Sequence, residues 1–138
     1  MGRIMALDYG KKRTGIAITD PLQLIASGLE TVPTEGLMPF LERYLKQEHV
    51  TCLVIGEPRR MDYSPSEIEP EIQEFIQSFQ GRFPDLPIAR QDERFTSKLA
   101  VKAMIAGGAK KKTRQNKATI DTISATLILQ AYLSKKDL

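Results

Sequence analysis

The chain has 138 residues, of which 41% are hydrophobic and 27% charged, with a net charge of +3, as is typical of one globular domain spanning residues 1–138. No apolar run approaches the ~18 residues of a membrane span, and no secretory signal is evident, so we expect a cytoplasmic location. One cysteine and one histidine exclude a zinc site of nitrogen and sulfur ligands, so any metal must be held by oxygens, which favours Mg²⁺ or Mn²⁺.

Three short strands are predicted at the start of the chain. Arg3–Asp8 and Thr14–Thr19 are apolar runs of strand length, and a short turn with Gly10 and three cations separates them. Such a turn predicts an antiparallel hairpin. Gly28–Val32 is the third predicted strand.

Helices and strands alternate in the rest of the chain. A helix is predicted over Gly36–Glu48, a buried strand over Val50–Gly56, and a helix ending near Phe79 with Ser66 and Glu69 as a capping box. The remaining predictions are a strand over 86–93, a helix from Thr96 to Gly107-Gly108, and a helix over 117–133 that buries Ile120, Ile123, Leu127, Ile128 and Ala131. This order predicts an α/β fold, a mixed sheet with helices on its faces.

Three acids stand where such a fold could bring them together. Asp8 ends the first strand, Asp92-Glu93 ends the last strand, and Asp121 flanks the apolar stripe of the last helix. Converging carboxylates repel one another, and a divalent metal relieves that repulsion. Two Mg²⁺ ions about 4 Å apart can activate water and stabilise the leaving oxygen of a phosphodiester. The pattern therefore predicts a metal-dependent phosphodiester hydrolase.

Each acid also has a structural alternative. Asp8 could cap the turn that follows it, Asp92-Glu93 could pair with Arg90 or Arg94, and Asp121 could occupy the first turn of its helix, where acids are favoured.

Basic residues are concentrated near the C-terminus. Residues 94–138 contain ten basic and two acidic residues, whereas residues 57–93 contain four basic and nine acidic ones. The densest run is KKKTRQNK at 110–117, which indicates either a polyanionic partner such as nucleic acid or a solvated lysine-rich loop. The predicted nucleic-acid contacts are Lys11, Lys12, Arg13, Arg94, Lys110, Lys111, Lys112, Arg114 and Lys117.

Four sequence blocks resemble, in order and spacing, the bacterial YqgF-type family, whose members are described as pre-16S rRNA nucleases or Holliday junction resolvase-like proteins. The blocks are ALDYGKKRTGIAITD, VIGEPRRMD, DERFTS and IDTISATLILQAYL, and the resemblance covers essentially the whole chain. It implies an RNase H-like fold, with a five-stranded mixed sheet of order 3-2-1-4-5, strand 2 antiparallel, and flanking helices.

The resemblance also implies roles for single residues. Asp8, Glu93 and Asp121 match the family's catalytic, metal-binding acids, and the implied activity is Mg²⁺- or Mn²⁺-dependent cleavage of structured nucleic acid in small-subunit rRNA maturation. The chain departs from the family at Glu57, where an apolar residue is usual, and at Tyr63, where a glycine is common. Since related resolvases place an acid near that strand end, Glu57 is a candidate fourth ligand.

Other functions are compatible with the same residues. A Holliday junction DNA endonuclease would use the same acids, and a non-catalytic RNA-binding assembly factor would keep the basic residues while the acids take structural roles. A sugar-kinase or actin-like ATPase shares the Asp-x-Gly hairpin, but it needs two such domains and the chain has no glycine-rich phosphate loop. RNA or DNA as substrate, and a monomer or homodimer, are both compatible with the sequence.

Overall fold

The computed structural model describes residues 2–58, 66–92 and 117–136. In chain order, the elements are β1 (Arg3–Tyr9), β2 (Arg13–Thr19), β3 (Ala26–Pro33), the 3-10 helix η1 (Thr34–Gly36), α1 (Leu37–Gln47), β4 (Val50–Glu57), α2 (Glu69–Arg82), β5 (Ile88–Asp92) and α5 (Lys117–Lys136). The helix predicted from Thr96 to Gly107-Gly108 lies outside the described residues.

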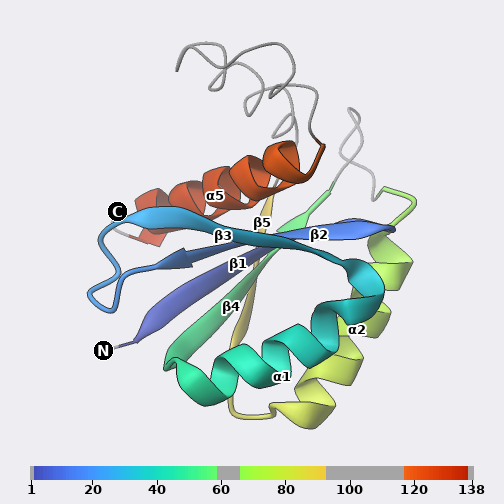
Figure 1. Cartoon of the computed structure of the whole chain (residues 1–138), viewed down its shortest axis with the longest axis horizontal. Helices are drawn as coiled ribbons and strands as arrows, with labels where there is room; N and C mark the ends of the chain where they lie inside the picture. Colours follow the sequence, from blue (N-terminus) through green and yellow to red (C-terminus); the bar gives the residue numbers. More distant parts are fainter. Residues whose placement is uncertain (1, 59–65, 93–116, 137–138) are drawn as a thin grey trace.

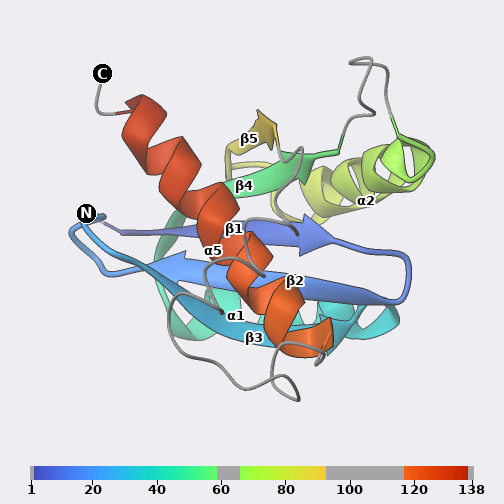
Figure 2. The same ribbon diagram turned by 90° about the horizontal axis from the view of Figure 1, so that it is seen from above.

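The five strands form one sheet in the order β3-β2-β1-β4-β5, which confirms the predicted order. β2 runs antiparallel to β1 and β3, whereas β1, β4 and β5 are parallel, so the sheet is mixed as predicted. Helices α1 and α2 cover one face of the sheet and α5 covers the other (Figure 1). Figure 2 shows α5 crossing the strands obliquely, and its contacts are mainly with β1, β2 and β3.

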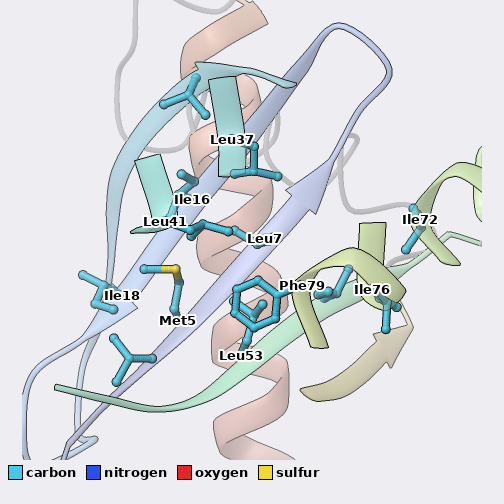
Figure 3. Packing of buried hydrophobic residues seen from close by; sticks show 13 residues of the cluster. Met5, Leu7, Ile16, Ile18, Leu37, Leu41, Leu53, Ile72, Ile76 and Phe79 are labelled. Carbon is cyan, nitrogen blue, oxygen red and sulfur yellow. The ribbon is translucent and has the colours of Figure 1, made fainter. Parts of the chain in front are cut away.

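Two hydrophobic clusters hold the layers together, one on each face of the sheet. The larger lies under α1 and α2 and includes Met5, Leu7, Ile16, Leu41, Leu53, Ile55, Ile72 and Phe79 (Figure 3). The smaller lies under α5 and contains Ile4, Ala6, Ala17, Val54, Ala125, Ile128 and Leu129. Because successive side chains of a strand point to opposite faces, β1 and β4 supply both clusters.

The predicted buried stripe of the last helix is confirmed at Ile128 but is wrong in its rotation. The fully buried residues of α5 are Ser124, Ala125, Ile128 and Leu129. Ile123 and Leu127 are half-buried, and Ala131 is exposed. The helix is thus turned so that Asp121, one turn before Ser124 and Ala125, lies in line with the buried stripe.

Glycines on the sheet explain this rotation. A Cβ atom at Gly15 on β2 would lie 2.1 Å from the main-chain oxygen of Asp121, and one at Gly28 on β3 would lie 2.4 Å from Cγ2 of Thr122. The first turns of α5 therefore rest directly on the backbone of the sheet. The small residues of the helix provide the complementary surface for this close approach.

The predicted capping box at the start of α2 is also wrong. The N-cap is Ile68, without a side-chain cap, and the Ser66 carbonyl accepts the Glu69 N–H at 3.2 Å. Pro70 lies in the first turn of α2, where backbone N–H groups have no partner within the helix, so its missing N–H costs no helical hydrogen bond. The Glu69 carboxylate pairs instead with Arg90 on β5, accepting two hydrogen bonds of 2.9 Å.

The turn between β2 and β3 is held by Asp20. Its carboxylate accepts hydrogen bonds from the backbone N–H groups of Ile25 (2.7 Å), Leu24 (2.8 Å) and Leu22 (3.1 Å). The turn needs this support because Gln23 adopts a left-handed φ of 62° and because Leu22, Leu24 and Ile25 are each at least 60% exposed.

We expect Asp20 to make the stability of the protein depend on acid pH. The hydrogen bond from the backbone N–H of Ile25, together with those from Leu24 and Leu22, lowers the pKa of the Asp20 carboxyl below its ordinary value. A lowered folded-state pKa stabilises the protein above the unfolded-state pKa, and this stabilisation is lost as the pH falls through the folded-state value. NMR titration of the carboxyl and unfolding curves for wild type and Asp20→Asn measure this. The stability difference between the two proteins should shrink as the pH falls below about 4, and a constant difference would contradict the assignment.

Candidate active site

Asp8 lies near the carboxyl end of β1, on the face covered by α5. Ile4 and Ala6 belong to the cluster under α5, whereas Met5 and Leu7 belong to the opposite cluster. Because side chains alternate between the faces along a strand, Asp8 lies on the same face as Ile4 and Ala6. The Asp8 side chain is half-buried there, and its cross-strand partner in the antiparallel ladder is Gly15.

Asp121 reaches the same place from the other layer. Its main-chain oxygen and Cβ lie over Gly15, where an added Cβ would be 2.1 Å and 3.1 Å from them. Since Asp8 is the ladder partner of Gly15, the structure brings two of the three predicted acids to one spot, although 113 positions separate them in the sequence. Thr122 fixes the same turn of α5, because its hydroxyl is hydrogen-bonded to that of Thr31 on β3.

Glu57 lies on the other face of the sheet. Val54 is in the cluster under α5 and Ile55 in the cluster under α1 and α2, so alternation puts Gly56 on the α5 face and Glu57 opposite. The metal role suggested for Glu57 stays a prediction, and this placement does not support it.

Gln91 is a neighbour of this site that the sequence did not suggest. It is the ladder partner of Gly56, and alternation from Ala89 places it on the α5 face. Its Oε1 atom is buried and accepts no hydrogen bond from any described residue. Gly56 adds no side chain between β1 and β5, and the ladder register places Gln91 at the same end of the sheet as Asp8. A buried polar group without a partner is unusual in a folded protein.

Arg13 forms an ion pair with Asp121. The Nε atom donates to Oδ2 at 2.7 Å, and the two side chains are 38% and 22% exposed, respectively. Arg13 opens β2 and lies on the α5 face, two residues before Gly15. The structural alternative predicted for Asp121, a place in the first turn of its helix, is wrong, because the first turn of α5 holds no acid. One oxygen of Asp121 is instead engaged by the Arg13 cation.

The remaining cations of the β1–β2 turn form an exposed rim beside the acids. Lys11 and Lys12 are exposed, and Gly10 permits the tight turn because an added Cβ would lie 2.3 Å from the Arg13 carbonyl oxygen. The N–H of Thr34 donates to the Lys12 carbonyl at 2.9 Å, which ties the turn to η1. This rim offers fixed positive charge to a polyanion.

Several predicted site residues fall outside the described residues. These are Glu93, Arg94, Lys110, Lys111, Lys112 and Arg114, and also the side chain of Lys117, at which α5 begins. Within residues 2–58, 66–92 and 117–136, no group of three or more His, Cys, Asp or Glu side chains could hold a metal ion. The described part of the predicted metal site is therefore the pair of Asp8 and Asp121.

The described residues fit an oxygen-binding metal. Asp8 and Asp121 both lie beside Gly15, and Gln91, at the same end of the sheet, has a buried oxygen without a partner. Carboxylate and amide oxygens are the hard ligands that Mg²⁺ and Mn²⁺ prefer.

Comparison with known proteins points to one family. Residues 2–135 match the family model RuvX, described as Holliday junction resolvase. A Christiangramia forsetii protein named "Putative pre-16S rRNA nuclease" is 59% identical over 133 residues, covering 96% of this chain and 98% of that protein. Proteins of the same name from Bacteroides fragilis and Porphyromonas gingivalis are 53% and 48% identical, and each covers at least 99% of both chains.

Solved structures support the fold. A crystal structure of the fowlpox virus resolvase with its substrate Holliday junction DNA has a TM-score of 0.63 and 12% identity, covering 97% of this chain and 98% of that chain. A second structure of the fowlpox virus Holliday junction resolvase has a TM-score of 0.55 and 15% identity. The RNase H-like fold predicted from the sequence is confirmed. None of the helices within the described ranges combines the length and apolarity of a membrane span.

Proposed function

Because the chain belongs to the RuvX family of Holliday junction resolvases, the YqgF-type family, we propose that it is a metal-dependent nuclease acting on structured nucleic acid, with the 5′ end of pre-16S rRNA as its substrate. The observation that carries this proposal is the meeting of Asp8 and Asp121 at Gly15, beside a cationic turn. The names of the curated relatives support the choice of rRNA as the substrate.

Asp8, Asp121 and Glu93 would hold Mg²⁺ or Mn²⁺ in this proposal. The chemistry that such ions supply is the activation of water and the stabilisation of the leaving oxygen at a phosphodiester. The close packing of α5 on Gly15 holds the Asp121 backbone in place beside Asp8 before substrate binds. Such preorganisation lowers the reorganisation needed in the transition state.

Lys11, Lys12 and Arg13 would position the substrate. Lys11 and Lys12 lie in the β1–β2 turn and Arg13 begins β2, all at the end of the sheet where Asp8 lies, so a phosphate backbone that they bind passes close to the acids. Contacts of this kind are electrostatic and independent of sequence, and binding should weaken as salt is added.

A cleavage panel tests the proposal. Purified protein is incubated with precursor 16S rRNA, four-way junction DNA and duplex DNA of unrelated sequence, each with Mg²⁺, with Mn²⁺ and with EDTA. We expect specific cleavage of the rRNA precursor that requires the metal and stops in EDTA. Cleavage of the junction alone would move the assignment to a DNA resolvase, and cleavage that persists in EDTA would contradict the metal-dependent mechanism.

A non-catalytic RNA-binding factor is the second candidate. The ion pair between Arg13 and Asp121 favours it, because it gives one predicted catalytic acid a structural role. Salt-dependent binding of the precursor with no cleavage of any substrate, in either metal, would support this candidate over the nuclease.

A further inference from the structure

The ion pair between Arg13 and Asp121 joins the two halves of the proposed site. Arg13 belongs to the cationic turn expected to contact phosphate, and Asp121 to the acids expected to bind metal. The pair uses only Nε of the guanidinium, and neither Nη group donates a hydrogen bond to a described residue. Both terminal nitrogens therefore offer a first contact to a phosphate, which then competes with Asp121 for the guanidinium.

Because of this pair, Arg13 and a divalent cation compete for the Asp121 carboxylate. The Asp121 oxygen that accepts this charge-assisted hydrogen bond at 2.7 Å has fewer lone pairs left for a divalent cation. The guanidinium charge beside it opposes the approach of another cation. A phosphate is in turn a strong acceptor for Arg13, because guanidinium binds phosphate oxygens through two parallel hydrogen bonds.

We propose that Arg13 is a positioning residue that couples substrate binding to metal binding. Contact between a substrate phosphate and the Nη groups draws the guanidinium away from Asp121, and the released carboxylate joins Asp8 in holding the metal. This inference rests on the proposed function, because Asp8 and Asp121 are its predicted ligands. Thermodynamic linkage makes the coupling reciprocal, so bound metal strengthens nucleic-acid binding by the same factor.

The first test measures Mn²⁺ binding to the full-length protein without nucleic acid, by calorimetry and by the electron paramagnetic resonance signal of free Mn²⁺. Arg13→Gln removes the competing charge, so we expect it to bind Mn²⁺ about tenfold more tightly than wild type. Arg43→Gln is the matched control, because Arg43 is an exposed residue of α1 outside the site and its substitution changes the net charge equally. Its affinity should stay within about twofold of wild type, which is the effect expected of a distant screened charge.

A second variant ties the effect to Asp121. We expect the tighter Mn²⁺ binding of Arg13→Gln to vanish in the double variant with Asp121→Asn, since the gain depends on the released carboxylate. Circular dichroism and thermal unfolding verify that each variant is folded. A gain that survives in the double variant would show that Arg13 acts on the metal by another route and would overturn the inference.

The third test measures the coupling itself. Fluorescence anisotropy of a labelled precursor-rRNA hairpin is recorded on ice with Mn²⁺ or with EDTA, and a gel verifies that the RNA is intact. Wild type should bind the hairpin about tenfold more tightly with Mn²⁺, whereas for Arg13→Gln the difference should fall below about twofold.

The outcomes separate this inference from the proposed function. Saturable Mn²⁺ binding by wild type with equal or weaker binding by Arg13→Gln would overturn the coupling role and leave the metal-dependent nuclease standing. Absence of saturable Mn²⁺ binding by every variant would contradict the metal site itself and the proposed function with it.

Discussion

Replacing Asp8 by Asn is expected to lower the rate of metal-dependent cleavage about a thousandfold or more. A metal site supplies several kcal/mol of transition-state stabilisation, and a loss of about 4 kcal/mol corresponds to a factor of about a thousand. Asn keeps the size of the side chain but not its charge, and Asp8 is only half-buried near the end of β1. The substitution should therefore leave the fold and its unfolding temperature nearly unchanged.

The measurement is a single-turnover cleavage rate on the substrate that the panel identifies, with Mg²⁺ in excess. Asp85→Asn is the matched control, because Asp85 is exposed in the turn before β5, at the end of the sheet opposite to Asp8. We expect the control to cleave at the wild-type rate. Undiminished cleavage by Asp8→Asn would contradict the role of this acid and with it the proposed mechanism.

Replacing Gly15 by Ala should destabilise the protein by about 3 kcal/mol, the upper part of the range for overpacking a tightly packed site. The added Cβ would lie 2.1 Å from the main-chain oxygen of Asp121, and a backbone atom cannot yield as a flexible side chain can. Helix α5 must shift, which moves Asp121 away from Asp8. Cleavage should fall together with stability, and the unfolding temperature should drop by about 10 °C.

Gly81→Ala is the control for this experiment, and it should change the stability in the opposite direction. Gly81 lies in α2 and is exposed, and an added Cβ there meets nothing within 4 Å. Alanine in a helix is favoured over glycine by about 0.5–1 kcal/mol, so this variant should be slightly more stable than wild type. Equal stability of Gly15→Ala and wild type in thermal unfolding would show that α5 does not rest on β2 as described.

Much of the fold could be predicted from local patterns along the chain. The Gly10 turn between two apolar runs predicts the antiparallel hairpin, and the alternation of helices and strands predicts the mixed sheet with helices on its faces; the strand order followed from the family resemblance. These features are predictable because strand and helix periodicity and turn chemistry act over a few residues. The position of Asp8 at a strand end belongs to the same class of prediction.

The rotation of α5 could not be predicted in this way. Its sequence offers two overlapping apolar stripes, and helical periodicity alone favoured the one through Ile123 and Leu127. The choice was made by Gly15 and Gly28, whose missing side chains make room for Asp121 and Thr122 at the start of α5. With these turns in place, Ser124 and Ala125 are buried. A helix docks where its surface and that of its partner fit together, and that partner lies about a hundred residues away in the sequence.

The sequence by itself determined which side chains are available: an acid at the end of the first strand, an isolated acid in the last helix, and a cationic turn. Only the tertiary structure decided which of them meet. Asp8 and Asp121 both lie beside Gly15, and Arg13 forms an ion pair with Asp121. Glu57 lies on the opposite face of the sheet, because side chains alternate along its strand. The reason is physical, because contacts between distant residues depend on how whole elements pack, and no local propensity records that packing.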